Sequence, residues 1–117
     1  MVNKRKTGTD YENLAADFLE RKGYKIIKRN YRVRSGEIDI IAMDGRYLVF
    51  LEVKYRVNMH KGSALEAVDY RKQQTIYRTA RFFLRQYHFP EEQPCRFDVI
   101  GITGDQIQHV ENAFGGL

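Results

Sequence analysis

The chain has 117 residues, of which 43% are hydrophobic and 30% charged, a composition that fits one folded domain and excludes a disordered chain. Its apolar runs are only a few residues long, so none can span a bilayer, and no apolar stretch near the N-terminus resembles a secretory signal. The single cysteine, Cys95, and three scattered histidines make neither a disulfide nor a zinc pattern. These features predict a single domain, residues 1–117, in the cytoplasm and away from membranes.

The net charge of +5 is unevenly distributed along the chain. Residues 1–62 contain 14 Lys/Arg and 8 Asp/Glu, whereas residues 63–117 contain 6 and 7. A basic half suits a polyanionic partner, most commonly nucleic acid and less often an acidic membrane surface. Charge alone is a weak indicator, because many basic proteins bind no polyanion.

The first expected element is a helix from about Asp10 to Lys22, followed by Gly23 at the C′ position. A strand is expected next, from Tyr24 to about Tyr31. The basic segment 32–36 then reads as a loop. Residues 1–8 are predicted to form a flexible basic arm.

Two strands rich in β-branched and aromatic residues follow, at 37–43 and 47–56. Asp44-Gly45 between them predicts a hairpin with a two-residue type I′ turn. In that register Asp39 lies opposite Phe50, and Glu37 lies opposite Glu52. A slip of one residue would move one set of side chains to the other face.

The second half of the chain predicts one long helix and one or two strands. A capping box at 63–66 opens the helix, which is expected to continue to about Tyr87. A strand at 96–102 follows, a partner strand at 106–110 can pair with it, and residues 112–117 are expected to be a flexible tail. The predicted fold class is therefore α/β, a mixed sheet flanked by two helices.

The predicted hairpin places several charged side chains on one face. Glu37, Asp39 and Glu52 would lie together, with Lys54 one step further along. Like charges opposite one another destabilise a sheet, unless a cation compensates them or one carboxyl keeps its proton. Mg²⁺ (or Mn²⁺) prefers such oxygen ligands, and a neighbouring lysine can stabilise a transition state of increasing negative charge. The alternative interpretation is the ordinary solvated face of an amphipathic strand, but Leu48 and Phe50 share this face.

Two charges on the expected helices could join this cluster. Glu12 lies at the edge of the apolar stripe of the first helix, and Lys72 lies inside the stripe of the second. Each could equally be a charge that reaches solvent along its own stem. Both would face the carboxylates if the helices pack over the hairpin.

The residues also form a pattern that extends over most of the chain. Asp39 is followed, after twelve residues, by Glu52-Val53-Lys54, as in the D-x(n)-E-x-K signature. The other matching positions are Gly8, Glu12, Ala15, Gly23-Tyr24, Arg29-Asn30-Tyr31-Arg32, Gly36-Glu37-Ile38-Asp39, Phe50-Leu51, Tyr55-Arg56, Lys72 and Arg96-Phe97-Asp98. This pattern resembles the YraN-like family of predicted bacterial endonucleases, in the restriction-endonuclease-like (PD-(D/E)xK) nuclease superfamily, related in core to archaeal Holliday-junction resolvases. Ile38 departs from the proline that often precedes the aspartate in this superfamily.

The resemblance implies a restriction-endonuclease-like αβββαβ core. It implies that Asp39, Glu52 and the Val53 carbonyl bind Mg²⁺ or Mn²⁺, with Lys54 as the catalytic lysine and Glu12 as an acidic residue near the metal. Glu37 and Lys72 would support this site.

The resulting hypothesis is a metal-dependent endonuclease that hydrolyses phosphodiester bonds in DNA, including branched or structured DNA. Arg32, Arg34, Arg56 and Lys61 would contact phosphates, and a homodimer is a reasonable expectation because cutting two strands needs two sites. Two alternatives remain open: a non-catalytic nucleic-acid-binding protein that retains the fold, and a partner-binding protein with no nucleic-acid role. Fold membership alone does not decide among them.

Overall fold

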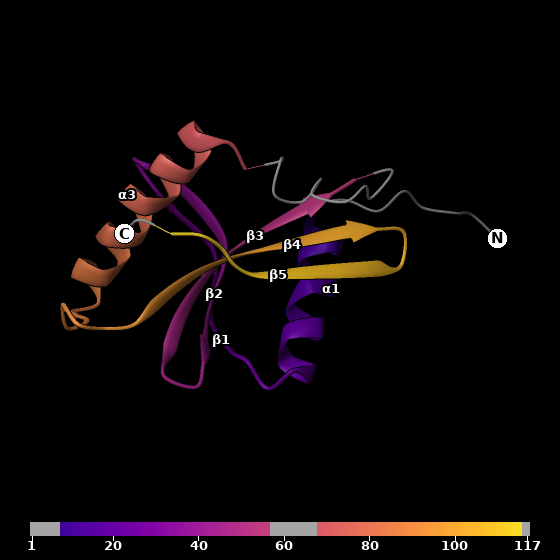
Figure 1. Ribbon diagram of the computed structural model, residues 1–117, viewed down its shortest axis with the longest axis horizontal. Helices are drawn as coiled ribbons and strands as arrows, with labels where there is room; N and C mark the ends of the chain where they lie inside the picture. The colour runs from indigo at the N-terminus through magenta and orange to yellow at the C-terminus, as the bar shows by residue number, and fades with distance from the viewer. Residues whose placement is uncertain (1–7, 57–67, 116–117) are drawn as a thin grey trace.

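The computed structural model describes residues 8–56 and 68–115. These residues form two helices and five strands, in the order α1 (Gly8–Arg21), β1 (Lys25–Val33), β2 (Gly36–Asp44), β3 (Tyr47–Tyr55), α3 (Tyr70–Gln86), β4 (Cys95–Thr103) and β5 (Gln106–Phe114) (Figure 1). The strands make one sheet in the order β1-β2-β3-β4-β5, with β3 and β4 parallel and the other neighbours antiparallel. The predicted α/β class, a mixed sheet with two helices, is confirmed. Neither described helix has the length and apolar character needed to cross a membrane.

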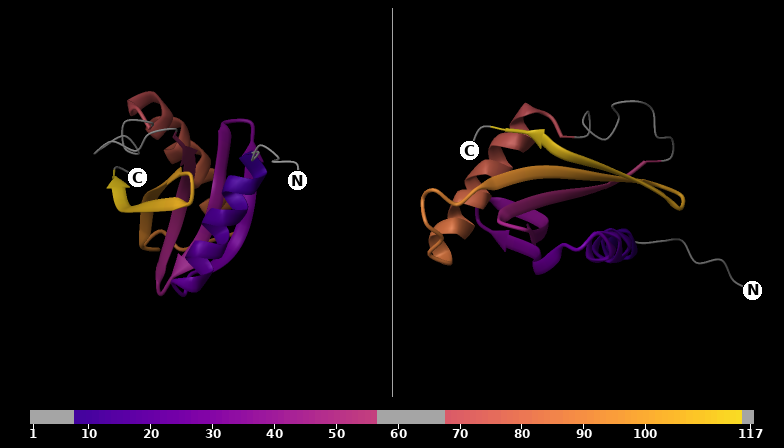
Figure 2. Two further views of the ribbon diagram at one scale, coloured as in Figure 1. Left: turned by 90° about the vertical axis from the view of Figure 1, so that its right-hand side faces the viewer. Right: turned by 60° about the horizontal axis from the view of Figure 1, so that its bottom comes forward.

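The two helices cover opposite faces of the sheet (Figure 2). Ala15, Ala16 and Leu19 of α1 pack against one face, where Val49 and Leu51 of β3 contribute to the core. α3 packs on the other face, with Ile76, Ala80 and Phe83 in one core cluster with Phe50 and Phe97. Because both faces are covered, β3 and β4 are buried along most of their length, as is usual for the parallel part of a sheet.

The helix boundaries follow their caps. α1 ends just before Gly23, whose φ of +94° is the left-handed conformation expected after a helix. α3 begins at Tyr70, because Asp69 is its N-cap and accepts a hydrogen bond from the N–H of Lys72. The prediction of one continuous helix from Ser63 is therefore wrong, since Val68 is a bend and Asp69 is extended. The capping box at 63–66 itself lies outside the described residues.

The β2–β3 hairpin has a different register from the predicted one. Asp44 pairs with Tyr47, so the two loop residues are Gly45 and Arg46, and only Gly45 has a positive φ. This pattern fits a type II′ turn instead of type I′. Asp44 stays in the strand because its carboxylate accepts a hydrogen bond from Arg96 of β4 at 2.9 Å. The shift is by two residues, an even number, so the paired residues 40–44 and 47–51 keep their predicted faces.

The strands at the two edges of the sheet are longer than predicted. β1 continues through Arg32 to Val33, so the turn into β2 is only Arg34-Ser35. β5 extends to Phe114, which stacks on Phe97 at 5.5 Å between ring centroids. It therefore includes residues 112–114 of the predicted tail, while residues 1–7 of the predicted arm lie outside the described ranges.

The turn between β1 and β2 packs tightly against α3 at Gly36. A Cβ atom on Gly36 would lie 2.6 Å from Thr75 Cγ2 and 3.0 Å from Thr79 Oγ1, closer than atoms can approach without movement. The Ser35 and Thr79 hydroxyls are 3.2 Å apart at the same contact. Glycine is therefore required at position 36 by close approach, which fixes the start of β2 relative to α3.

Candidate functional site

A cavity of about 200 Å³ opens where β2 and β3 extend beyond their mutual pairing. The pairing ends at Ile40–Leu51, whereas the strands continue to Gly36 and Tyr55. The lining residues are Gly8, Tyr11, Glu12, Glu37, Asp39, Glu52, Val53, Lys54, Tyr55 and Lys72. All seven residues predicted as catalytic, metal-binding or supporting thus line one cavity.

Along β2, the regular alternation of side chains between the two faces of the sheet is interrupted at Asp39. Ile38 packs in the core beneath α3, whereas Ile40, two residues later, packs in the core beneath α1. Residues two apart on a regular strand share a face, so β2 is distorted between them. Asn30 lies opposite this break on β1 and has a left-handed φ of 51°. The distortion places Asp39 at the boundary between the two faces of the sheet.

The Asp39 carboxylate is held by the neighbouring strand. Its Oδ2 atom accepts a hydrogen bond from the backbone N–H of Val53 at 2.8 Å. Burial raises the pKa of Asp39 and the charge of Glu37 adds to this, whereas the Val53 hydrogen bond and the lysines at 54 and 72 oppose it. The pKa of Asp39 lies above its ordinary value, which means that the hydrogen bond and the two lysines do not fully offset the cost of burying its negative charge.

Glu52 is the most deeply buried carboxylate of the cavity, with 3% of its surface exposed. Its Oε2 atom lies 3.5 Å from Lys72 Nζ and 3.7 Å from Lys54 Nζ. Its Oε1 atom is buried without a hydrogen-bond partner. Burial and the charge of Asp39 raise the pKa of Glu52 to about 7, despite the opposing lysines. A buried acceptor with no donor is costly, and Glu52 is also a lining residue of the cavity.

Glu12 approaches the same carboxylates from α1. Burial and the charge of Asp39 raise its pKa, while a hydrogen bond from Asn30 and the charge of Arg29 oppose that rise. Glu12 and Lys72 come from helices on opposite faces of the sheet, yet both reach the cavity. Each helix therefore contributes one charged side chain to the lining of the cavity.

Glu37 is arranged differently from the prediction. In the observed register it does not lie opposite Glu52, and its carboxylate forms an exposed ion pair with Arg32 at 2.8 Å. Exposed pairs of this kind contribute at most about 1 kcal/mol. Glu37 therefore lies at the rim of the cavity, while Asp39 and Glu52 lie deeper.

The residues predicted to contact phosphates lie on several parts of the surface. Arg34 is exposed on the β1–β2 turn, and Arg32 forms an ion pair with Glu37. Arg56 follows the end of β3, where its guanidinium donates to the Tyr55 carbonyl at 3.2 Å. Lys61 lies outside the described residues.

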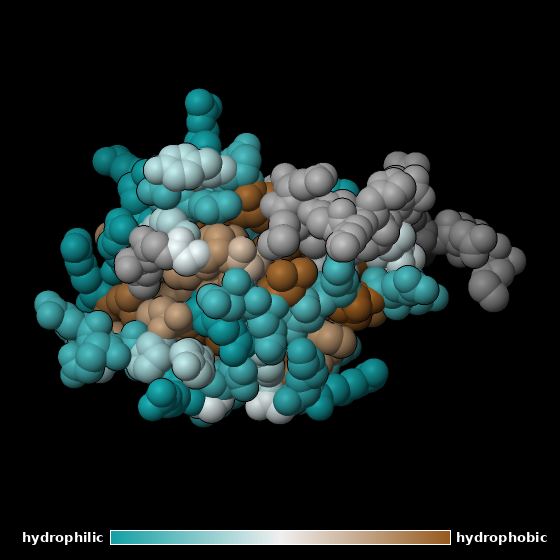
Figure 3. Space-filling view, viewed as in Figure 1, coloured by the Kyte–Doolittle hydropathy of each residue, from teal (hydrophilic) through white to brown (hydrophobic). Residues whose placement is uncertain are grey.

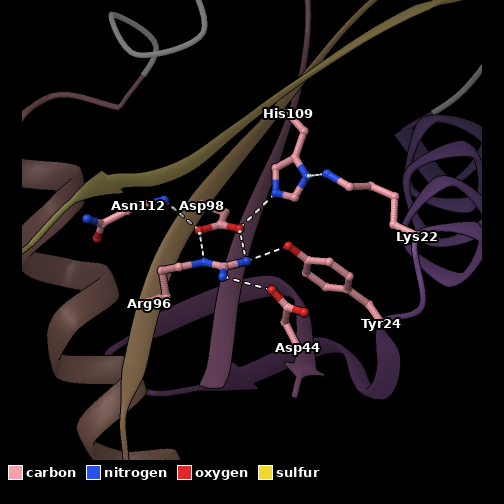
Figure 4. Close-up of polar contacts among 7 residues, drawn as sticks. All are labelled: Lys22, Tyr24, Asp44, Arg96, Asp98, His109 and Asn112. Atoms are coloured by element: carbon pink, nitrogen blue, oxygen red, sulfur yellow. Dashed lines mark hydrogen bonds and ion pairs between the residues drawn. The ribbon is translucent and has the colours of Figure 1, made fainter. Parts of the chain in front are cut away.

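A second buried carboxylate, Asp98 of β4, has the opposite environment (Figure 4). Arg96 donates to both of its oxygens at 3.0 Å, and the Asn112 N–H donates at 2.9 Å. His109 Nε2 lies 2.7 Å from Asp98 Oδ2. The Nδ1 atom of His109 lies 2.8 Å from the Lys22 ammonium, which can only donate, so a hydrogen bond at this contact uses Nδ1 as the acceptor.

Arg96 ties this cluster to the rest of the fold, since it also donates to Asp44 and to the Tyr24 hydroxyl. Burial opposes ionisation of Asp98, but the hydrogen bonds from His109, Arg96 and Asn112 outweigh it and lower its pKa. Fully paired buried charges of this kind serve the fold. The unpaired oxygen of Glu52 distinguishes its cavity as the candidate site.

The carboxylates of the cavity do not form a complete metal cage. Among residues 8–56 and 68–115, no three His, Cys, Asp or Glu side chains are placed to hold a metal ion together. Asp39 and Glu52, beside the Val53 backbone and two lysines, are instead an open, incomplete ligand set. Such a set can bind a hard cation only with water or a substrate oxygen.

Sequence reasoning missed two features of this site. Asn30 belongs to the sequence pattern described above, but its hydrogen bond to Glu12 was not predicted. Asn30 has a positive φ, and the only sign of this in the sequence is that asparagine adopts such a conformation more readily than most residues. Tyr11 and Tyr55 stack at 4.3 Å between centroids and form one wall of the cavity. No local pattern relates these two tyrosines, since they meet only through the packing of α1 on β3.

The fold and this cavity define a small α/β protein with an acidic, lysine-flanked site at the end of a mixed sheet. The chain belongs to the uncharacterised protein family UPF0102, whose model matches residues 11–102. A UPF0102 protein of Lachnoclostridium phytofermentans is 47% identical over 113 residues, covering 97% of this chain and 96% of that protein. UPF0102 proteins of Prosthecochloris aestuarii and Thermodesulfovibrio yellowstonii are 49% and 45% identical, covering 92% of this chain and 91% and 94% of theirs.

Proposed function

We propose that this protein is a divalent-metal-dependent nuclease whose active site is the cavity around Asp39 and Glu52. The observation that carries the proposal is that Glu52 lines this cavity while its buried Oε1 atom has no hydrogen-bond partner. A cation beside it would supply the missing partner and offset the repulsion between Glu52 and Asp39. The resemblance of the Asp39…Glu52-Val53-Lys54 pattern to the restriction-endonuclease-like superfamily supports the same assignment.

Asp39, Glu52 and the Val53 carbonyl would hold Mg²⁺ or Mn²⁺, because hard oxygen ligands and one or two carboxylates suit these ions. Once bound, the ion would acidify a water molecule and neutralise charge on the scissile phosphate. Lys54, whose Nζ lies 3.7 Å from Glu52 Oε2, would orient the attacking water or balance charge developing on the phosphate. Lys72 would position Glu52 from the other side, and Glu12 would accept a proton or a water hydrogen bond.

The test is cleavage of labelled DNA in three forms: linear duplex, single strand and four-way junction, with Mg²⁺, Mn²⁺ or EDTA. The wild-type protein should cut at least one form in a metal-dependent manner. Asp39→Asn and Lys54→Ala should abolish cutting, whereas Glu20→Gln on the exposed side of α1 should not. Cutting that persists in pure Asp39→Asn protein would refute the site.

The same assay separates the alternative of a non-catalytic nucleic-acid-binding protein. That alternative predicts salt-sensitive binding in EDTA and no cleavage with any metal. The elevated pKa of Glu52 favours the catalytic proposal, because perturbed acidic groups that share a cavity are concentrated at active sites.

A further inference from the structure

The outer face of α3 carries a dense positive charge that the cavity does not use. The helix contains five Lys/Arg residues and no Asp or Glu. Lys72 turns towards Glu52, whereas the four arginines at 71, 78, 81 and 85 are exposed. Within the described part of the chain, none of these four forms an ion pair with a carboxylate. Hydrophilic side chains cover this end of the molecule in the space-filling view (Figure 3).

An aromatic ring lies among these arginines. Phe82 is 51% exposed, although Ile76, Ala80 and Phe83 of the same helix are buried. Arg81, Phe82 and Arg85 follow Arg78 by three, four and seven residues, and therefore lie on one side of the helix with it. Together with Ser35 they line an open groove of about 270 Å³.

The groove is connected to the candidate site through the β1–β2 turn. Ser35 lines the groove and contacts Thr79 of α3, and its neighbour Arg34 is exposed. Gly36 packs against α3 next in the chain, and Glu37 lines the rim of the candidate cavity. A strand lying in the groove can therefore continue over this turn towards Asp39 and Glu52.

The chemistry of the groove matches an unpaired nucleic-acid strand. Guanidinium groups bind phosphate oxygens through paired hydrogen bonds, and an exposed aromatic ring stacks on a base. A duplex hides the faces of its bases, so an exposed ring adds little to duplex binding. An acidic protein segment would satisfy the arginines but would leave Phe82 without a role.

We propose that the groove lined by Arg78, Arg81, Phe82 and Arg85 binds the single-stranded part of a nucleic acid, with a base stacked on Phe82. The role of this binding rests on the proposed function: the bound strand would bring the branch point of a partly unpaired substrate to the cavity. Binding in the groove itself needs no metal, so it is tested separately.

The test is fluorescence anisotropy in EDTA, with labelled dT20 and a labelled 20-base-pair duplex as probes. Phe82→Ala should weaken dT20 binding at least about fivefold, the lower end of what one stacked base contributes, and should leave duplex binding within about twofold. Phe82→Tyr, which keeps the ring, should retain the affinity. Arg78→Ala or Arg85→Ala should each reduce the salt dependence of dT20 binding by about 0.7 in log–log slope, whereas Arg21→Ala on α1 should change neither probe.

The proposal is overturned if Phe82→Ala leaves dT20 affinity unchanged, or weakens both probes equally. It is also overturned if polyglutamate displaces dT20 with equal effect on wild type and Phe82→Ala, which would identify an acidic protein segment as the ligand. Binding of dT20 that depends on Phe82, without cleavage by any metal-loaded form, would support the groove and refute the nuclease. Metal-dependent cleavage, together with dT20 binding that does not depend on Phe82, would support the nuclease and refute the groove.

Discussion

The pKa of Glu52 leads to a prediction about stability. Burial and the charge of Asp39 raise this pKa to about 7 in the folded protein, whereas a glutamate in the unfolded chain titrates near 4.5. Above pH 4.5 the unfolded chain releases its proton and the folded protein keeps it, so the free energy of unfolding falls as pH rises from 4.5 through 7. The difference in pKa corresponds to a loss of about 3 kcal/mol from this group.

Glu52→Gln removes the titration and leaves a neutral side chain of similar shape. Without metal, we therefore expect the variant to lose less stability than wild type between pH 5 and pH 8. At pH 8 it should be more stable than wild type by up to about 3 kcal/mol, an upper limit because the amide must find its own hydrogen bonds. Glu52→Gln would then stabilise the protein while removing a ligand of the proposed metal site. This outcome is expected where a functional residue is kept although it lowers the free energy of unfolding.

The measurement is urea denaturation in EDTA at several pH values, with the free energy of unfolding extrapolated to water. Glu20→Gln is the matched control, because this carboxyl lies on the exposed side of α1 and does not line the cavity. The control should keep the wild-type dependence on pH. Parallel pH profiles for wild type and Glu52→Gln would show that Glu52 is not held in a costly environment.

Three further perturbations test the site and its supports. Mn²⁺ at 100 times its dissociation constant should stabilise wild type by about 2.7 kcal/mol in thermal melts but leave Asp39→Asn unshifted; an equal shift in both would place the ion elsewhere. Gly36→Ala should cost about 1–3 kcal/mol in urea denaturation, because its Cβ would lie 2.6 Å from the Thr75 methyl. Thr75→Ser, which removes that methyl, should recover part of the loss, and a purely additive double variant would contradict the contact. Asp98→Asn should cost about 3–5 kcal/mol by leaving Arg96 and its partners uncompensated, whereas a change below about 1 kcal/mol would mean that this network does not stabilise the fold.

The order of the elements was predictable because periodicity is a local property of the sequence. Apolar residues recur at helical spacing before Gly23, and short β-branched runs follow on either side of Gly45. The cavity residues were also predictable, although the hairpin register was wrong. The error was two residues, and an even error leaves Glu52 and Lys54 on the face expected for them, whereas Asp39 lies at the boundary between the faces.

Two of the errors in the prediction arose where distant contacts decide local structure, and a third concerns the start of α3. Asp44 was assigned to the turn from its neighbour Gly45, but Arg96, 52 residues later in the chain, holds it in the strand. The start of α3 was assigned to a capping box, whereas Asp69 caps the described helix. Asn112 was expected in a flexible tail, but its N–H binds the buried Asp98. The contacts of Asp44 with Arg96 and of Asn112 with Asp98 join residues that are distant in sequence, so local propensity could not identify them. The Asp69 cap is a local contact with Lys72.

The position of the candidate site follows from the way the sheet is covered. Glu12 and Lys72 come from helices on opposite faces, and an intact sheet would separate them. They can line one cavity only beyond the last β2–β3 pair, where Asp39 lies between the two faces. The distortion shared by Asn30 and Asp39 is therefore what allows one site to draw charges from both helices. If that distortion exists to bring Glu12 to the carboxylates, replacing Asn30 with glycine should preserve the backbone and lose only the hydrogen bond to Glu12.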